Sequence, residues 1–125
     1  MKTLVVETQK LRDNLKIVRE IVAKNNKETK LIAVIKGNGY GLGLVEYAQF
    51  LVDNGIEFLA VATVEEAIRL REKGIKEDIL MMSSTAVKED IELLIKNNII
   101  LTIGSKESGD IAEETHFRSD YVLGI

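Results

Sequence analysis

The chain has 125 residues, 46% of them hydrophobic and 30% charged, which is typical of a folded domain rather than a disordered or fibrous segment. Seventeen Lys and Arg against 20 Asp and Glu leave a formal charge of -3, which argues against nucleic acid or an anionic membrane as a partner. There is no Cys and one His, so disulfides are excluded and we expect no metal site. The apolar patch at residues 4–6 is far shorter than a signal-peptide core or a membrane span, so we expect a cytoplasmic protein.

The first predicted elements are a short strand and a helix. Val5 and Val6 are expected to close an N-terminal strand. A stripe of apolar residues at spacings of four, three and four then predicts an amphipathic helix over residues 8–24, with Leu11, Leu15, Val18 and Val22 on one face. No Pro and no Ser- or Gly-rich linker follows, which favours one continuous domain.

Apolar runs and helical stripes then alternate. Residues 31–35 form an apolar run without polar alternation, which is typical of a parallel strand covered on both faces. This run is the first strand of the alternating pattern. A helical stripe begins at Leu44, and Asn54-Gly55 is expected to end that helix with a left-handed cap. The second strand is predicted at residues 58–62, and Thr63 with Glu66 has the form of a capping box at the start of the next helix.

The same pattern continues toward the C-terminus. The helix that begins after Thr63 is expected to stop at Gly74, and a third strand of the alternating pattern is predicted at residues 79–82. Met81 and Met82 in that strand are interpreted as core residues rather than cofactor contacts. A helical stripe from Val87 to Ile95 precedes a fourth strand at residues 99–103. Residues 108–114 are expected to be helical and residues 120–124 to form a fifth strand, with His116 interpreted as an exposed side chain.

Strand–helix alternation predicts an α/β fold with parallel (β/α) units and right-handed crossovers. Periodicity leaves two architectures open. One is an open doubly wound sheet, as in a small flavodoxin-like binding or signalling module, and the other is a (β/α)8 TIM-type barrel. A full barrel needs at least about 200 residues, so in the barrel interpretation this chain holds the first half of one.

Lys36 directly follows the first buried strand. Its amine is therefore expected at the C-terminal end of the sheet, where α/β folds place their active sites. Partial withdrawal from water there favours the neutral amine, a nucleophile that can form a Schiff base. A lysine that merely extends its ammonium into solvent from a strand end is the simpler alternative, and it is disfavoured by the residues that follow.

Glycines recur at every second position after Lys36, at Gly37, Gly39, Gly41 and Gly43. Such a loop carries little side-chain bulk, can approach a ligand closely and can adopt positive φ. It is not a dinucleotide fingerprint, because Leu42 stands where that motif requires Gly, and no P-loop Gly-Lys-Ser or Gly-Lys-Thr follows.

The sequence AVIKGNGYGLG, residues 33–43, resembles the pyridoxal-phosphate lysine motif of alanine racemases, which usually reads AVVKANAYGHG; seven of the eleven positions agree. The resemblance extends over residues 4–103 and includes the segment LAVATVEEA at residues 59–67. It departs from the family where Gly37 and Gly39 replace alanines and Leu42 replaces histidine, changes that we expect to be tolerated.

The resemblance implies the first half of a fold type III barrel that binds pyridoxal 5'-phosphate. Lys36 would hold the cofactor through a Schiff base and act as the catalytic base on one face of the substrate α-carbon. Tyr40 would bind the cofactor phosphate through its hydroxyl. The implied reaction interconverts L-alanine and D-alanine, the latter for bacterial peptidoglycan, and the implied assembly is a homodimer. The alternative enzyme is another fold type III barrel protein, and those relatives lack the Asn-x-Tyr-Gly continuation found after Lys36.

Residues 1–125 are accordingly expected to be a partial N-terminal barrel domain, without the second half of the barrel and without a C-terminal β domain. Half a barrel leaves two strand edges unpaired, and unpaired edges invite association with another chain. We therefore expect self-association or coverage of these edges by further segments, and doubtful racemase activity of this chain alone.

Overall fold

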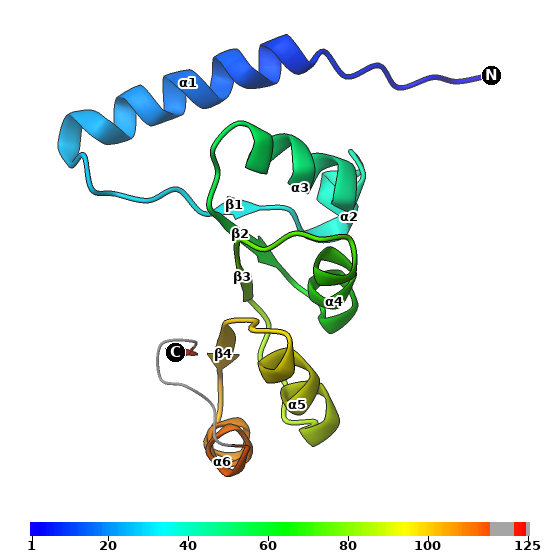
Figure 1. Ribbon diagram of the computed structural model, residues 1–125, viewed down its shortest axis with the longest axis vertical. Helices are drawn as coiled ribbons and strands as arrows, with labels where there is room; N and C mark the ends of the chain where they lie inside the picture. Colours follow the sequence, from blue (N-terminus) through cyan, green and yellow to red (C-terminus); the bar gives the residue numbers. More distant parts are fainter. Residues whose placement is uncertain (116–121, 125) are drawn as a thin grey trace. The chain divides into compact units, whose positions relative to one another are not determined.

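The computed structural model describes residues 1–115 and 122–124 (Figure 1). Two compact units divide the chain, residues 1–31 and residues 32–125, and each is described by itself. The first unit consists of one helix and the segments on either side of it.

Helix α1 (Thr8–Asn25) makes up most of the first unit and confirms the predicted helix. Leu11, Leu15 and Val22 of the predicted stripe are half-buried, and no residue of α1 is fully buried. The strand predicted at Val5 and Val6 does not form: both residues are exposed and non-helical, and a strand requires a hydrogen-bonded partner strand. No helix among the described residues is long and apolar enough to cross a membrane.

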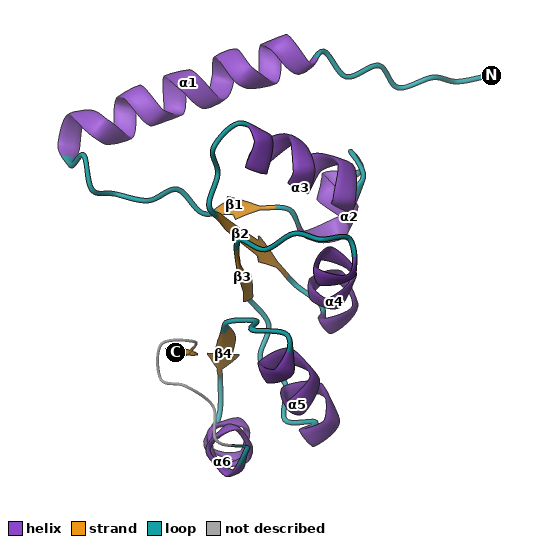
Figure 2. Cartoon of the chain, in the orientation of Figure 1, coloured by secondary structure: helices purple, strands orange, loops and turns teal. Residues whose placement is uncertain are grey.

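The second unit contains the predicted parallel strands, with bounds up to two residues from the predicted ones (Figure 2). β1 (Ala33–Val34), β2 (Phe58–Val61) and β3 (Asp78–Met81) form one sheet in that order, and β4 (Leu101–Ile103) pairs with β5 (Val122–Gly124). A parallel bridge between Leu80 and Ile100 joins β3 to the start of β4. Of the predicted fifth strand, Asp120 and Tyr121 lie outside the described residues, as does His116.

The strand order follows the chain without a reversal. A doubly wound sheet reverses its strand order at a switch point, whereas a barrel adds each strand beside the previous one. The helices behave in the same way, because α3 (Leu44–Asp53), α4 (Val64–Glu72), α5 (Lys88–Lys96) and α6 (Lys106–Glu114) each contact the next. The order of strands and helices therefore favours the barrel architecture over the flavodoxin-like one.

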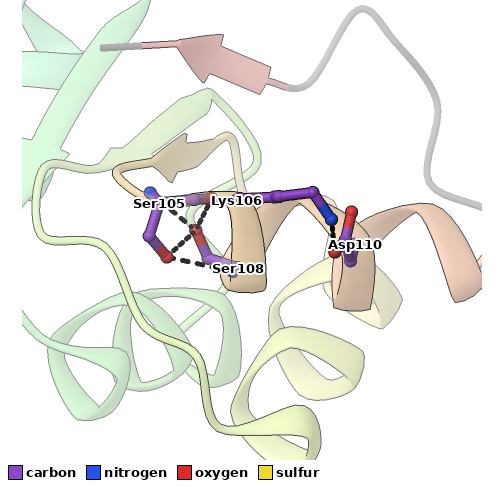
Figure 3. Close-up of polar contacts among 4 residues, drawn as sticks. All are labelled: Ser105, Lys106, Ser108 and Asp110. Carbon is purple, nitrogen blue, oxygen red and sulfur yellow. Dashed lines mark hydrogen bonds and ion pairs between the residues drawn. The ribbon is translucent and has the colours of Figure 1, made fainter.

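The helix ends confirm most of the predicted caps. Gly55 and Gly74, with φ of 84° and 88°, take the left-handed conformation after α3 and α4. The predicted capping box at Thr63 and Glu66 is present in full. Helix α6 begins two residues before the predicted start, because Ser105 and Ser108 form a second capping box whose third-position residue is Ser instead of Glu. Figure 3 shows these two serines facing each other, and further along α6 the ion pair of Lys106 with Asp110 at 2.8 Å.

Apolar side chains of the strands and of the inner helix faces form the core. The largest fully buried hydrophobic residues lie in both kinds of element or within two residues of a strand, and they are Ile35, Leu59, Val61, Leu70, Ile79, Ile91, Leu94 and Ile99. Met81 is buried, as predicted, whereas Met82 lies one residue beyond β3 and is 41% exposed, so its assignment to the core was wrong.

The amino ends of the strands are held by one side chain. The Arg71 guanidinium donates from Nη1 to the carbonyl oxygens of Ile75 and Glu77, at 2.9 and 2.8 Å, from Nε to that of Asn97 at 2.8 Å, and from Nη2 to that of Asn98 at 2.9 Å. These carbonyls belong to the loops that lead into β3 and β4. A planar guanidinium with five N–H donors suits this position, which lies opposite to the predicted site.

Candidate active site at the lysine turn

Lys36 follows β1 at the C-terminal end of the parallel sheet, as the sequence predicts. The residue before it, Ile35, is completely buried, and the Ile35 N–H donates to the Ala60 carbonyl oxygen on β2 at 2.8 Å. Lys36 itself is exposed, so the expected partial withdrawal of its amine from water does not occur within this chain. A solvent-accessible primary amine on a rigid strand end is the first component of the site.

The segment after Lys36 is a left-handed turn. Five consecutive residues have positive φ, namely Gly37 (63°), Asn38 (55°), Gly39 (65°), Tyr40 (54°) and Gly41 (88°). Positive φ at the glycines confirms the prediction, and left-handed Asn38 and Tyr40 were not anticipated. Asn tolerates this conformation better than most residues, whereas a Tyr there is uncommon. We refer to residues 36–43, which include the helix-like segment α2 (Lys36–Tyr40), as the lysine turn.

Asn38 connects the turn to the next helix. Its side-chain Oδ1 accepts from the Leu44 N–H at 2.9 Å, and its carbonyl oxygen accepts from the Gly43 N–H at 3.0 Å. The first contact satisfies one of the amides at the N-terminus of α3 that have no partner inside the helix. The only amino-acid types that combine a short acceptor side chain with tolerance of positive φ are Asn and Asp, which gives Asn38 a structural reason of its own.

Tyr40 and the glycines define the accessible surface of the turn. Tyr40 is 64% exposed, so most of the residue is accessible from solvent. A Cβ placed on Gly37 or Gly41 would meet no atom within 4 Å, which means that open space lies beside both glycines. Gly39 faces the opposite way, because a Cβ there would lie 3.3 Å from the Tyr47 side chain on α3.

Glu66 on α4 holds the turn through its carboxylate. Oε1 accepts from the N–H groups of Gly37 at 2.8 Å and Asn38 at 3.4 Å. Oε2 accepts from those of Ala62 at 3.0 Å and Thr63 at 3.2 Å. Burial raises the pKa of Glu66, but the four backbone N–H bonds together outweigh burial and hold the pKa below its ordinary value. The contact to the lysine turn spans 29 residues, and the capping-box pattern that predicts the Thr63 contact gives no sign of it.

The next strand ends carry hydroxyl groups rather than charged side chains. Ser84, which follows β3, accepts from the Gly104 N–H at 3.0 Å through its Oγ, and its own hydroxyl donates to Ser108 Oγ at 3.4 Å. Gly104 directly follows β4. These contacts join the C-terminal ends of β3 and β4, and they use the hydroxyl groups that the sequence places there.

The chain is similar in sequence to racemases over most of its length. It is 39% identical over 106 residues to an amino-acid racemase of Enterococcus faecalis, covering 85% of this chain and 14% of that protein. It is 38% identical over 103 residues to an alanine racemase of Pediococcus pentosaceus, covering 82% and 26%. The chain therefore spans about a quarter or less of the length of these relatives.

The chain is also similar to solved structures of alanine racemases. The alanine racemase of Bacillus anthracis with bound L-Ala-P superimposes with a TM-score of 0.77 at 31% identity, over 88% of this chain and 28% of that one. The alanine racemase of Clostridium difficile in complex with cycloserine gives 0.70 at 37% identity, over 82% and 28%. The family described as alanine racemase, N-terminal domain, matches residues 6–124. The chain, with its parallel (β/α) units and its lysine turn, belongs to the alanine racemase N-terminal domain family.

Proposed function

We propose that this chain supplies the cofactor lysine of an alanine racemase, and that Lys36 is that lysine. The observation that carries the proposal is the exposed lysine at the end of β1, followed at once by a left-handed turn that leaves open space beside it. Membership of the family makes pyridoxal 5'-phosphate the group to test against these residues.

The residues present fit that group. Lys36 offers an accessible amine for the cofactor's aldehyde, and Tyr40, 64% exposed, offers a hydroxyl donor for its phosphate. Gly37 and Gly41 leave room for a ligand beside the turn, because no atom would contact a Cβ at either position. Pyridoxal phosphate, when bound, supplies an electron sink for negative charge at the substrate α-carbon.

The chain's own residues then have separate tasks. Lys36 binds the cofactor and moves the proton at the substrate α-carbon on one face. Tyr40 would hold the phosphate of the cofactor through its hydroxyl. The group that moves the proton on the opposite face is not among the residues assigned here, so the complete reaction is proposed for the whole protein to which these residues contribute.

The proposed reaction is the interconversion of L-alanine and D-alanine, with D-alanine supplied to the bacterial cell wall. A histidine racemase of Leuconostoc mesenteroides is also similar, with a TM-score of 0.75 at 29% identity, so the fold of this chain is compatible with a racemase that acts on a larger side chain. We assign alanine because most of the relatives cited above are named alanine racemases. We further propose that the whole protein is a cytoplasmic homodimer.

The proposal is tested by adding pyridoxal phosphate to the purified chain and recording the absorbance near about 420 nm before and after borohydride reduction. Peptide mapping then locates the reduced adduct. We expect the adduct on Lys36 and its loss in Lys36→Ala. The matched control is Lys76→Ala, since Lys76 is also exposed but precedes β3 at the opposite end of the sheet. An adduct spread evenly over surface lysines, in a chain that is folded by circular dichroism, would refute the assignment.

A further inference from the structure

We propose that Glu66 is a positioning residue for Lys36, acting through the backbone of the lysine turn. This inference rests on the proposed function, because the direction of Lys36 matters chemically only if its amine reacts. Glu66 lies on α4, beyond the next strand in the chain, and its carboxylate joins the ends of β1 and β2.

The need for such a group follows from the turn itself. The first N–H groups of any helical turn have no acceptor inside it, and in the lysine turn these include Gly37 and Asn38. Later amides of the turn bond internally, as when Gly39 N–H donates to the Ile35 carbonyl oxygen at 2.9 Å. Glu66 Oε1 accepts from both of the remaining N–H groups, at 2.8 and 3.4 Å. Hydrogen bonds of this kind, from an amide to a charged carboxylate, are stronger than bonds between neutral groups.

Hydrogen bonds hold the backbone on both sides of Lys36. The residue before it is fixed by the bond from Ile35 N–H to Ala60 of β2, and the residue after it by the bond from Gly37 N–H to Glu66. Both acceptors belong to the same β2–α4 segment. The backbone on either side of the Lys36 Cα is therefore tied to one rigid support, which sets the direction in which its side chain leaves the strand.

The second oxygen of Glu66 ensures that this support is itself rigid. Oε2 accepts from Ala62 and Thr63, while the Thr63 hydroxyl accepts from the Glu66 N–H at 3.1 Å. Glu66 is thus held by the start of α4 as it holds the turn. Glutamine cannot replace it, because an amide has one acceptor oxygen and would present N–H donors to two of these N–H groups.

Amide hydrogen exchange measured by NMR provides a test that does not depend on the cofactor. We expect Glu66→Gln to raise the exchange rate of the Gly37 amide about ten- to a hundredfold, the loss expected for a hydrogen bond to a charged group. Thr63→Ala is the matched control, because it removes the hydroxyl cap of α4 and leaves the contact from Glu66 to Gly37 intact. Glu65→Gln, on the exposed neighbour, controls for the change of charge.

Reductive labelling with pyridoxal phosphate provides the readout specific to positioning. We expect Glu66→Gln to reduce the share of adduct on Lys36 about tenfold, and Thr63→Ala to leave that share unchanged. The proposal would be overturned if the Gly37 amide exchanged equally slowly in the wild type and in Glu66→Gln. It would also be overturned if Thr63→Ala raised the exchange rate of that amide as much as Glu66→Gln does. A wild-type chain without any Lys36 adduct would refute the proposed function, while exchange at Gly37 would still decide the role of Glu66.

If Glu66→Gln does not fold, the wild-type chain alone is sufficient. During an acid titration followed by NMR, the Gly37 amide proton should shift with the same midpoint as the Glu66 carboxyl carbon, because protonation removes the charged acceptor. A Gly37 amide that does not respond to the titration of Glu66 would overturn the positioning role.

Discussion

Replacing Gly37 or Gly39 by Ala separates two effects in the lysine turn, the cost of a positive φ and the cost of crowding by an added Cβ. Gly37 and Gly39 have nearly equal φ, 63° and 65°, so alanine at either position costs about 1–2 kcal/mol for the left-handed conformation. The surroundings differ. A Cβ at Gly37 meets nothing within 4 Å, whereas one at Gly39 lies 3.3 Å from two atoms of the Tyr47 side chain and 3.7 Å from the Leu44 Cα.

The expected loss of stability is about 1 kcal/mol for Gly37→Ala, near the lower end of the conformational cost. Gly39→Ala adds a term for crowding against Tyr47, about 1 kcal/mol at the low end of overpacking effects, giving about 2 kcal/mol in total. The pair is matched, because both variants gain one methyl group at similar φ. The difference between them therefore measures the contact with α3.

The assay is urea denaturation of both variants and the wild type, followed by circular dichroism. The free energies of unfolding are compared on the condition that the m values of the three proteins are equal. Each variant adds only one methyl group to the turn, so we expect both variants to fold and to retain adduct formation at Lys36. Equal destabilisation of the two variants, within about 0.5 kcal/mol, would show that the Tyr47 side chain moves away from the added methyl group without a loss of stability. That result would refute the reasoning.

Three further predictions concern the rest of the second unit. Arg71→Lys cannot make all four carbonyl contacts before β3 and β4, because an ammonium has three donors on one atom, and it should destabilise the chain by about 2–4 kcal/mol. Arg69→Lys, on the exposed face, should change stability little, and thermal melting would measure both variants. Gly104→Ala should destabilise by about 1–3 kcal/mol, because its Cβ would lie 2.8 Å from the Ser84 Cβ, and Ser84→Gly in the same chain should recover part of that loss in urea denaturation. The pKa of Glu66 is lowered on folding, so its carboxylate stabilises the chain at neutral pH. The destabilisation by Glu66→Gln should therefore be full at neutral pH and should vanish as the pH falls through the lowered pKa. Denaturation at several pH values would show this dependence.

The order of elements could be predicted from local sequence patterns alone. Residues 31–35 are apolar throughout, and the spacing of Leu44, Ala48 and Leu51 matches a helical face, so strand and helix are distinguished by period. Boundaries were less accurate. The strand ends depend on which N–H and C=O groups find partners in the neighbouring strand, and β1 therefore covers only Ala33–Val34 of its apolar run.

The lysine turn was recognised from the sequence because a chemical motif is contiguous. Lys36, Asn38 and Tyr40 stand within five residues, and their identity and spacing are readable without a structure. Left-handed Tyr40 was not predictable, since no propensity favours a bulky residue at positive φ. The conformation is maintained by the glycines around it and by the contacts of Asn38 to α3.

The sequence by itself therefore determined the alternation of strands and helices, the position of Lys36 at a strand end and the resemblance to alanine racemases. Only the tertiary structure decided that the strands follow one another without reversal and that Glu66 holds the turn. The physical reason is the range of the interactions. Helical periodicity and motif spacing are local properties of the chain, whereas the bond from Gly37 N–H to Glu66 joins residues 29 positions apart, and it forms only when parallel pairing brings the ends of β1 and β2 together.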